Sequence, residues 1–244
     1  MKPRAIDLNG PIGTLAPPAT IGVMVLLDRS SSMHAIKLQM EAAFAEFIEG
    51  QKALDPEGMW LSLYQFDSRG YDTCYERRPL AEVPPLGLTP RGNTPLNDAL
   101  FRFGTQAQRV VDDPDDQTER LLLVVITDGE ENASNMHTRG DWQALLAKLE
   151  GPDCELLWLG TDKAVTEAVV NAYVNPAAAV AWTGENVAYA TAGLAQSVTS
   201  FRAGSQAMNT MNSYTASDGQ VDNSELDAAF LRARRLQREQ TPKA

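Results

Sequence analysis

The sequence predicts an α/β protein built on one doubly wound, mostly parallel sheet with helices on both faces. Two long apolar runs, within 21–27 and 120–127, are typical of strands that are buried on both faces. Segments with apolar residues at three- and four-residue steps lie between these and other strand-like runs. Because strands and helices alternate along the chain, we expect parallel strands joined by crossover helices.

The first part of the chain is expected to contain an arm, a helix and three strands. Residues 1–20 carry four prolines and two glycines, which indicates an extended arm. After the strand at 21–27, helical spacing of apolar residues predicts a helix over 34–54. Residues 60–66 are typical of a strand, and the more polar 72–80 predict a second strand nearer an edge of the sheet.

The rest of the body alternates between helices and strands. The expected elements are the helix 95–111, the strand 120–127, the helix 141–149, the strand 154–160, the helix 165–174, the strand 178–182 and the helix 186–201. The acidic segment 112–119 lacks the Asp-x-Asp-x-Asp-Gly spacing of a calcium loop, so we interpret it as a solvated turn.

These elements define one domain over 21–203, preceded by the arm at 1–20. From 204 to 223 the residues are small and polar, which predicts a linker. An amphipathic helix is expected over 224–240, opened by Ser224 and Asp227 in a variant of the capping box. Two hypotheses remain open for this helix, namely docking on its own domain and binding a partner protein.

The charge balance excludes some classes of partner. The chain has 244 residues and a formal net charge of −11. This acidity argues against nucleic acid, whose phosphates need a basic surface, and against an anionic membrane surface. It is compatible with cation binding, although a net negative charge also serves solubility.

The cysteines and the first residues predict a cytoplasmic protein. Cys74 and Cys154 lie in separate strand-like runs, and nothing in their spacing suggests a disulfide framework. Residues 1–20 lack the apolar core of a signal peptide, and the run at 21–27 is too short to span a bilayer.

Three segments carry oxygen-bearing side chains where the chain leaves a strand or enters a helix. Asp28, Ser30 and Ser32 follow the first apolar strand, Thr94 precedes the helix at Pro95, and Asp128 follows the second apolar strand. Each segment has a structural alternative, because Asp, Ser and Thr are common helix caps and Asp-Gly is a common turn. All of them nevertheless fall on the side of a doubly wound sheet that binds ligands.

The chemistry of these residues is consistent with a metal site. Two carboxylates and three hydroxyls suit Mg²⁺ or Mn²⁺, which are hard cations that take oxygen ligands. Ca²⁺ is a poorer fit, because a calcium buffer site would use more acids. Neutral hydroxyls leave part of the cation's charge available for an anionic oxygen from outside.

In this order, the five residues resemble the metal-ion-dependent adhesion site (MIDAS) of the von Willebrand factor A (VWA) domain family. The segments "TDGEEN" and "GNTPLNDAL" also resemble bacterial members of that family. The resemblance covers roughly residues 21–201, and the lack of a signal peptide favours a bacterial or phage intracellular type. It implies a six-stranded, VWA/Rossmann-like sheet with the metal at its top.

The resemblance also implies a role for each residue. Ser30, Ser32 and Thr94 would coordinate the metal directly or switch with the state of the site, and Asp28 and Asp128 would do so directly or through water. A partner protein's Asp or Glu would often fill the open position. Arg29 departs from the family pattern, because a small or polar residue is usual there. It places a cation near the site, where it would repel the metal slightly or help to hold a partner's carboxylate.

The sequence predicts a binding module and not an enzyme. Neither His34 nor His137 forms a recognisable catalytic motif with a serine, and no nucleotide-binding loop is present. One alternative is a structural or assembly protein whose arm and C-terminal helix make the contacts. A weaker alternative is a metal-dependent hydrolase with Glu130 or Glu131 as its base, although we expect both residues to be solvated.

Overall fold

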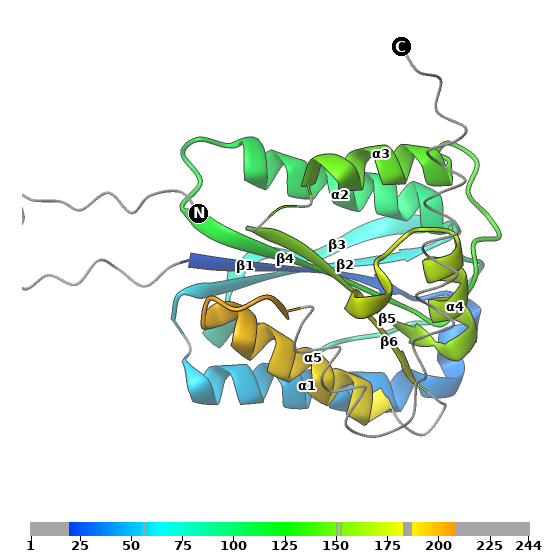
Figure 1. The fold of residues 1–244 in the computed structure, drawn as a ribbon. Coiled ribbons are helices and arrows are strands. Elements are labelled where there is room, and N and C mark those ends of the chain that lie inside the picture. Colours follow the sequence, from blue (N-terminus) through cyan, green and yellow to red (C-terminus); the bar gives the residue numbers. More distant parts are fainter. Residues whose placement is uncertain (1–19, 56, 150, 152, 183–186, 208–244) are drawn as a thin grey trace, which may run out of the picture.

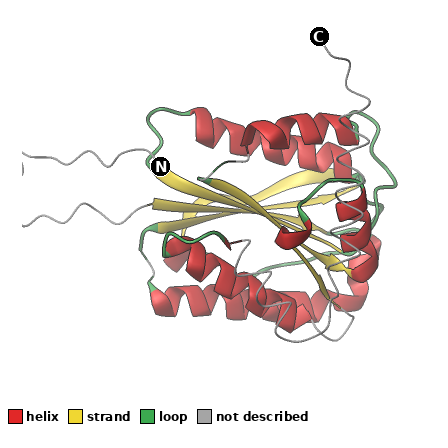
Figure 2. Ribbon diagram, in the orientation of Figure 1, coloured by secondary structure: helices red, strands yellow, loops and turns green. Residues whose placement is uncertain are grey.

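The computed structural model describes residues 20–55, 57–149, 151, 153–182 and 187–207 of the chain. Within these ranges one six-stranded sheet is covered by helices on both faces (Figure 1). Figure 2 shows the strands enclosed between two helical layers. The predicted fold class, a doubly wound and mostly parallel six-stranded α/β sheet, is therefore confirmed.

The strand order is β3-β2-β1-β4-β5-β6. The strands are β1 (Thr20–Asp28), β2 (Met59–Asp67), β3 (Gly70–Pro79), β4 (Thr118–Thr127), β5 (Cys154–Thr161) and β6 (Ala179–Trp182). Neighbouring strands are parallel except for β2 and β3, which pair antiparallel. The chain builds outward from β1 on one side first and then on the other. The strand order therefore reverses beside β1, where open α/β sheets bind ligands at the carboxyl ends of their strands.

Two pairs of helices sandwich the sheet. The α-helices are α1 (Lys37–Leu54), α2 (Leu96–Asp112), α3 (Arg139–Leu149), α4 (Asp162–Val170) and α5 (Val187–Arg202), and the short 3-10 helices are η1 (Ser31–Ile36), η2 (Leu80–Glu82) and η3 (Pro176–Ala178). Helices α1 and α5 pack side by side on one face, and α2 and α3 pack on the other (Figure 1). Helix α4 contacts β5 and β6.

Burial explains why the two longest apolar runs were recognisable. In β1 every residue from Ile21 to Asp28 is buried, and in β4 every residue from Leu121 to Thr127 is buried. Both strands lie at the centre of the sheet, so both of their faces need apolar side chains. By contrast, most residues of β3 are exposed, as expected for the polar edge strand predicted there.

Two helix boundaries differ from the sequence prediction. The segment expected to begin a helix at 34 starts as the 3-10 turn η1 and becomes α-helical at Lys37. The helix expected over 165–174 lies earlier, at Asp162–Val170, because Thr161 caps its start by accepting a hydrogen bond from the backbone N–H of Ala164. It ends before Ala172, whose φ of 55° is left-handed.

Several predicted segments lie outside the described residues, including nearly all of the arm at 1–20, most of the linker at 204–223 and the helix at 224–240. The first residues of the predicted linker pack onto the domain, since Ser205 O accepts a hydrogen bond from Arg120 Nη2 at 3.0 Å and Ala207 is buried. In the described part of the chain, no helix combines the length and the apolar character that a membrane crossing requires.

Candidate functional site

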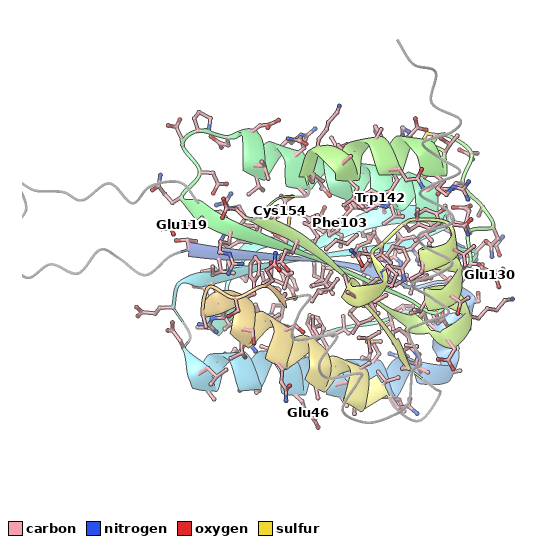
Figure 3. All side chains as sticks on the ribbon, in the orientation of Figure 1. Glu46, Phe103, Glu119, Glu130, Trp142 and Cys154 are labelled. Atoms are coloured by element: carbon pink, nitrogen blue, oxygen red, sulfur yellow. The ribbon has the colours of Figure 1, made fainter. Side chains whose placement is uncertain are left out.

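The three predicted segments meet at the edge of the sheet where β1 and β4 end. Asp28 is the last residue of β1, Asp128 directly follows β4, and Thr94 lies just before α2. Figure 3 places Glu130, of the loop after β4, at this edge and Glu119, near the start of β4, at the opposite one. Parallel pairing of β1 with β4 brings the first and third segments together.

Asp28 is a fully buried carboxylate whose hydrogen-bond donors are neutral. Its Oδ1 accepts from the backbone N–H of Ser30 at 2.6 Å, and its Oδ2 accepts from the Thr127 hydroxyl at 2.6 Å. Among the described residues it has no ion-pair partner. Burial raises the pKa of Asp28 to about 6, against the opposing effect of the hydrogen bonds from Thr127 and Ser30. The described residues therefore compensate its negative charge only in part, through neutral donors.

A chain of hydrogen bonds joins the first loop to the third. The hydroxyls of Ser30 and Ser32 lie 2.9 Å apart, and Ser32 Oγ donates to Asp128 Oδ1 at 2.8 Å. Burial raises the pKa of Asp128, and the hydrogen bond from Ser32 partly opposes this shift. Ser30 occupies the cap position of η1 but makes no side-chain capping hydrogen bond. Helix capping therefore does not account for its hydroxyl.

Thr94 is the fifth residue of the set, and its hydroxyl lies close to Gly129. A Cβ atom on Gly129 would lie 2.9 Å from Thr94 Oγ1 and 3.4 Å from Asp28 Oδ2. Both oxygens therefore face the same small space, which only glycine leaves open. Thr94 does not cap α2, because the cap residue is Pro95. The capping alternative considered for this threonine is thus not realised.

Residues of the third loop cap α2 instead. The carboxylate of Glu131 accepts from the backbone N–H of Asn97 at 2.7 Å, and Ser134 Oγ accepts from that of Asp98 at 3.1 Å. Asn132 pairs with the backbone of Thr94 through two hydrogen bonds. The Asn132 side-chain oxygen accepts from the Thr94 N–H at 2.9 Å, and the Asn132 backbone N–H donates to the Thr94 carbonyl at 3.1 Å. The second and third loops are therefore fixed to each other.

Some of these residues were missed or misjudged from the sequence. Glu131 was expected to be solvated, but it also accepts hydrogen bonds from the backbone of Ala133 and Ser134 and from the Ser134 hydroxyl. The acid and the amide that follow Asp-Gly in "TDGEEN" were the available signal for this loop structure. Thr127 gave no signal, because a threonine at the end of a strand is ordinary.

Arg29 does not face the site. It is buried, its Nε donates to Asp67 Oδ2 at 2.6 Å, and its Nη2 forms an ion pair with Asp72 Oδ2 at 2.6 Å. Two carboxylates of its own chain therefore hold this guanidinium. Neither expected role, repelling the metal or holding a partner's carboxylate, agrees with this geometry.

The donor set fits a hard divalent cation. In the ranges that the structure describes, no group of three or more His, Cys, Asp or Glu side chains could hold a metal ion. A cation at this edge would therefore depend on the hydroxyls of Ser30, Ser32 and Thr94 in addition to the two aspartates. Hydroxyl and carboxylate oxygens are ligands that Mg²⁺ and Mn²⁺ accept.

A cavity of about 340 Å³ lies beside the third loop. Its walls include Gly129, Glu130, Trp158, Glu167 and Tyr173. Glu130 forms an ion pair with the exposed Lys163. Gly129 is therefore shared between this cavity and the candidate site, while none of the five candidate donors lines it.

Comparisons with known proteins support the fold. No family model matches the chain, and no curated protein matches it. Among solved structures, it is similar to the vWF domain of the type V pili tip protein Mfa5 from Porphyromonas gingivalis, with a TM-score of 0.53, 11% identity, and coverage of 75% of this chain and 96% of that one.

Two longer proteins contain a similar domain. The pilus adhesin SpaC from Lactobacillus rhamnosus GG matches with a TM-score of 0.55 and 12% identity over 75% of this chain and 31% of its own. Proximal thread matrix protein 1 from the mussel byssus matches with a TM-score of 0.51 and 13% identity over 73% and 46%. The chain thus spans less than half the length of either protein.

These comparisons contradict the predicted cytoplasmic location. The matched structures include a pilus adhesin and a pilus tip protein, which belong to surface structures. The two free thiols were a weak basis for that prediction, because Cys154 is buried within β5 and Cys74 is exposed on β3, so the fold itself keeps them from pairing. The comparisons do bear out the architecture, and the described residues form a domain with a von Willebrand factor A-like fold.

Proposed function

We propose that this domain is a divalent-metal-dependent protein-binding module. In this proposal Asp28, Ser30, Ser32, Thr94 and Asp128 hold Mg²⁺ or Mn²⁺, and a partner protein supplies an Asp or Glu side chain. When bound, the cation would provide a coordination position for that carboxylate. The protein's contribution is to bring the five donors together and to leave the site without a cation of its own.

The observation that carries the proposal is that Asp28 is a buried carboxylate with only neutral hydrogen-bond donors. Transferring an ionised carboxylate into a protein interior costs several kcal/mol unless a cation or hydrogen bonds compensate it. Here two neutral donors compensate it only in part, and burial raises the pKa of Asp28 to about 6. A divalent cation beside this carboxylate would supply the missing charge.

The hydroxyls favour capture of an acidic group over simple storage of the metal. Ser30, Ser32 and Thr94 carry no charge, so they leave more of the cation's charge unneutralised than carboxylates would. The side chains of Ser30 and Thr94 are buried, whereas that of Ser32 is exposed. A partner would therefore approach from the side of Ser32 and the third loop.

We also propose that the domain has no catalytic role. The two candidate bases are engaged elsewhere, because Glu131 accepts hydrogen bonds from the loop and from α2 while Glu130 pairs with Lys163. General base catalysis requires a carboxylate within hydrogen-bond reach of the attacking water. Similarity in fold to adhesion and structural proteins supports the same view.

Isothermal titration calorimetry with MgCl₂ tests the metal site. We expect the wild type to bind Mg²⁺ and the Asp28→Ala variant to lose binding while keeping its far-UV circular dichroism spectrum. Ser31→Ala is the matched control, because Ser31 is an exposed neighbour that is not a proposed donor. Undiminished affinity in Asp28→Ala would refute the proposal.

An acidic peptide array tests partner capture. The array holds peptides with one Asp or Glu and matched copies with Asn or Gln in its place. Mg²⁺ should support binding of the acidic members only, and EDTA should abolish it. Binding that survives EDTA and ignores the acidic residue would instead favour the assembly role considered above.

A further inference from the structure

A second buried carboxylate, Asp67, lies beside the candidate site. It ends β2, the strand that pairs with β1 on the side away from β4. Its Oδ2 accepts from Arg29 Nε at 2.6 Å and from Arg91 Nε at 2.8 Å, and its Oδ1 accepts from the backbone N–H of Arg69 at 2.5 Å. Arg29 lies in the loop of Ser30 and Ser32, and Arg91 lies in the loop of Thr94. One carboxylate oxygen therefore holds both donor loops.

The backbones of these two loops also touch each other. The N–H of Arg91 donates to the Arg29 carbonyl at 2.8 Å, and the N–H of Ser31 donates to the Gly92 carbonyl at 3.0 Å. Gly92 adopts a left-handed φ of 68°. A Cβ there would lie 2.5 Å from Ser68 Oγ, so the second loop also packs closely on the turn after β2.

The charges explain why Asp67 controls this contact. Its side chain is fully buried and that of Arg29 is only 8% exposed. Burial alone would raise the pKa of Asp67, but hydrogen bonds from Arg91 and Arg29 outweigh this effect and lower it. Removing the carboxylate would leave the buried Arg29 with Asp72 as its remaining anion and would release Arg91.

We infer that Asp67 is a positioning residue for the proposed metal site, which it serves by holding the Ser30–Ser32 loop and the Thr94 loop at a fixed separation through Arg29 and Arg91. This inference rests on the proposed function. Asp67 does not itself donate to the metal. It fixes two of the three loops that carry the proposed donors, while Glu131 and Asn132 fix the second loop to the third.

The test compares Asp67→Asn with Asp116→Asn. Asp116 is a matched control, because its buried carboxylate also pairs with an arginine, Arg77, but lies just before the start of β4, at the opposite edge of the sheet. Calorimetry should show Mg²⁺ affinity reduced about 10- to 100-fold in Asp67→Asn, the range found when residues that orient metal ligands are changed. Asp116→Asn should bind Mg²⁺ within about twofold of the wild type. Equal affinity in Asp67→Asn and the wild type would overturn the inference.

A metal-free measurement keeps this inference separate from the proposed function. In chelator, hydrogen exchange at the amides of Ser31 and Arg91 should be at least about tenfold faster in Asp67→Asn than in the wild type, and unchanged in Asp116→Asn. If the wild type binds no Mg²⁺, the proposed function fails, and exchange still decides whether Asp67 holds the loops. Unchanged exchange at both amides would overturn the positioning role.

A milder variant covers the case in which Asp67→Asn does not fold. Arg91→Gln removes the link to the second loop and leaves the buried Arg29–Asp67 pair intact. It should speed exchange at Ser31 and weaken Mg²⁺ binding less than Asp67→Asn does. Wild-type behaviour in both measurements would contradict the inference.

Discussion

Two buried aspartates end neighbouring strands of the same sheet, and the protein treats their charges in opposite ways. Asp67, at the end of β2, receives hydrogen bonds from two arginines, and its pKa is lowered. Asp28, at the end of β1, receives hydrogen bonds from a hydroxyl and a backbone amide, and burial raises its pKa to about 6. Both side chains are shielded from solvent, and they differ in the hydrogen-bond partners that the fold gives them.

This contrast distinguishes a carboxylate with a structural role from one that we propose binds a metal. One arginine that could neutralise Asp28 is its immediate neighbour in the sequence, Arg29. Arg29 nevertheless turns to Asp67 and Asp72. Arg29 therefore joins the loops through Asp67 and does not pair with Asp28.

The largest expected effect is on stability without metal. Asp67→Asn should lower the free energy of unfolding by about 3–5 kcal/mol, because it removes one partner from a buried ion pair. Asp28→Asn should leave it unchanged or raise it, because no cation loses its partner. Urea unfolding in chelator at pH 7 measures both values, and a loss in Asp28→Asn equal to that in Asp67→Asn would remove the contrast.

The pH dependence of Asp28 should be the next largest effect. Its pKa of about 6 in the folded protein exceeds the ordinary value of 3.8, so the folded state binds the proton more tightly. Without metal, this group should therefore lower stability as the pH rises from about 4 to about 6, by about 3 kcal/mol in total. The difference in unfolding free energy between the wild type and Asp28→Asn isolates this contribution, and a difference independent of pH would contradict it.

Filling the space at Gly129 should weaken both metal binding and stability. A Cβ 2.9 Å from Thr94 Oγ1 must displace that side chain or the third loop. We expect Gly129→Ala to weaken Mg²⁺ binding about tenfold and to cost about 1–2 kcal/mol of stability. Gly87→Ala is the control, since its Cβ would meet nothing within 4 Å. Calorimetry and thermal melting of both variants measure the effect, and wild-type affinity in Gly129→Ala would show that Thr94 is not a donor.

The smallest expected effect concerns the link between the second and third loops. Glu131→Gln keeps the size of the side chain but replaces one acceptor oxygen by an amide, so it should cost about 1–2 kcal/mol of stability. Hydrogen exchange at the Asn97 amide should become faster, because this N–H donates a hydrogen bond to Glu131. Unchanged exchange there would mean that Glu131 is not needed to cap α2.

The sequence predicted the fold and the grouping of the five candidate donors for one physical reason. Central parallel strands must be apolar on both faces, and their carboxyl ends share an edge, so polar residues after such strands must lie close together. The direction of Arg29 could not be predicted in this way. It depends on Asp67, which ends a strand 38 residues later and becomes a neighbour only through the order of the sheet.

Other parts of the site depend on contacts that leave no local pattern. Glu131 looks like a solvated loop acid, and only the docking of the third loop on α2 gives it backbone partners. Likewise, Thr127 looks in the sequence like an ordinary end of an apolar strand. Only the structure shows that its hydroxyl donates to Asp28. Both residues act across loops far apart in the sequence.

The most direct test of the account is the response of thermal stability to Mg²⁺. A ligand that binds only the folded state raises the melting temperature, by an amount that grows with the logarithm of its concentration relative to its Kd. Wild-type protein should melt at a higher temperature in 10 mM MgCl₂ than in EDTA, with no such rise in Asp28→Asn. An equal rise in both proteins, or none in the wild type, would contradict the claim that Asp28 is left uncompensated in order to bind a divalent cation.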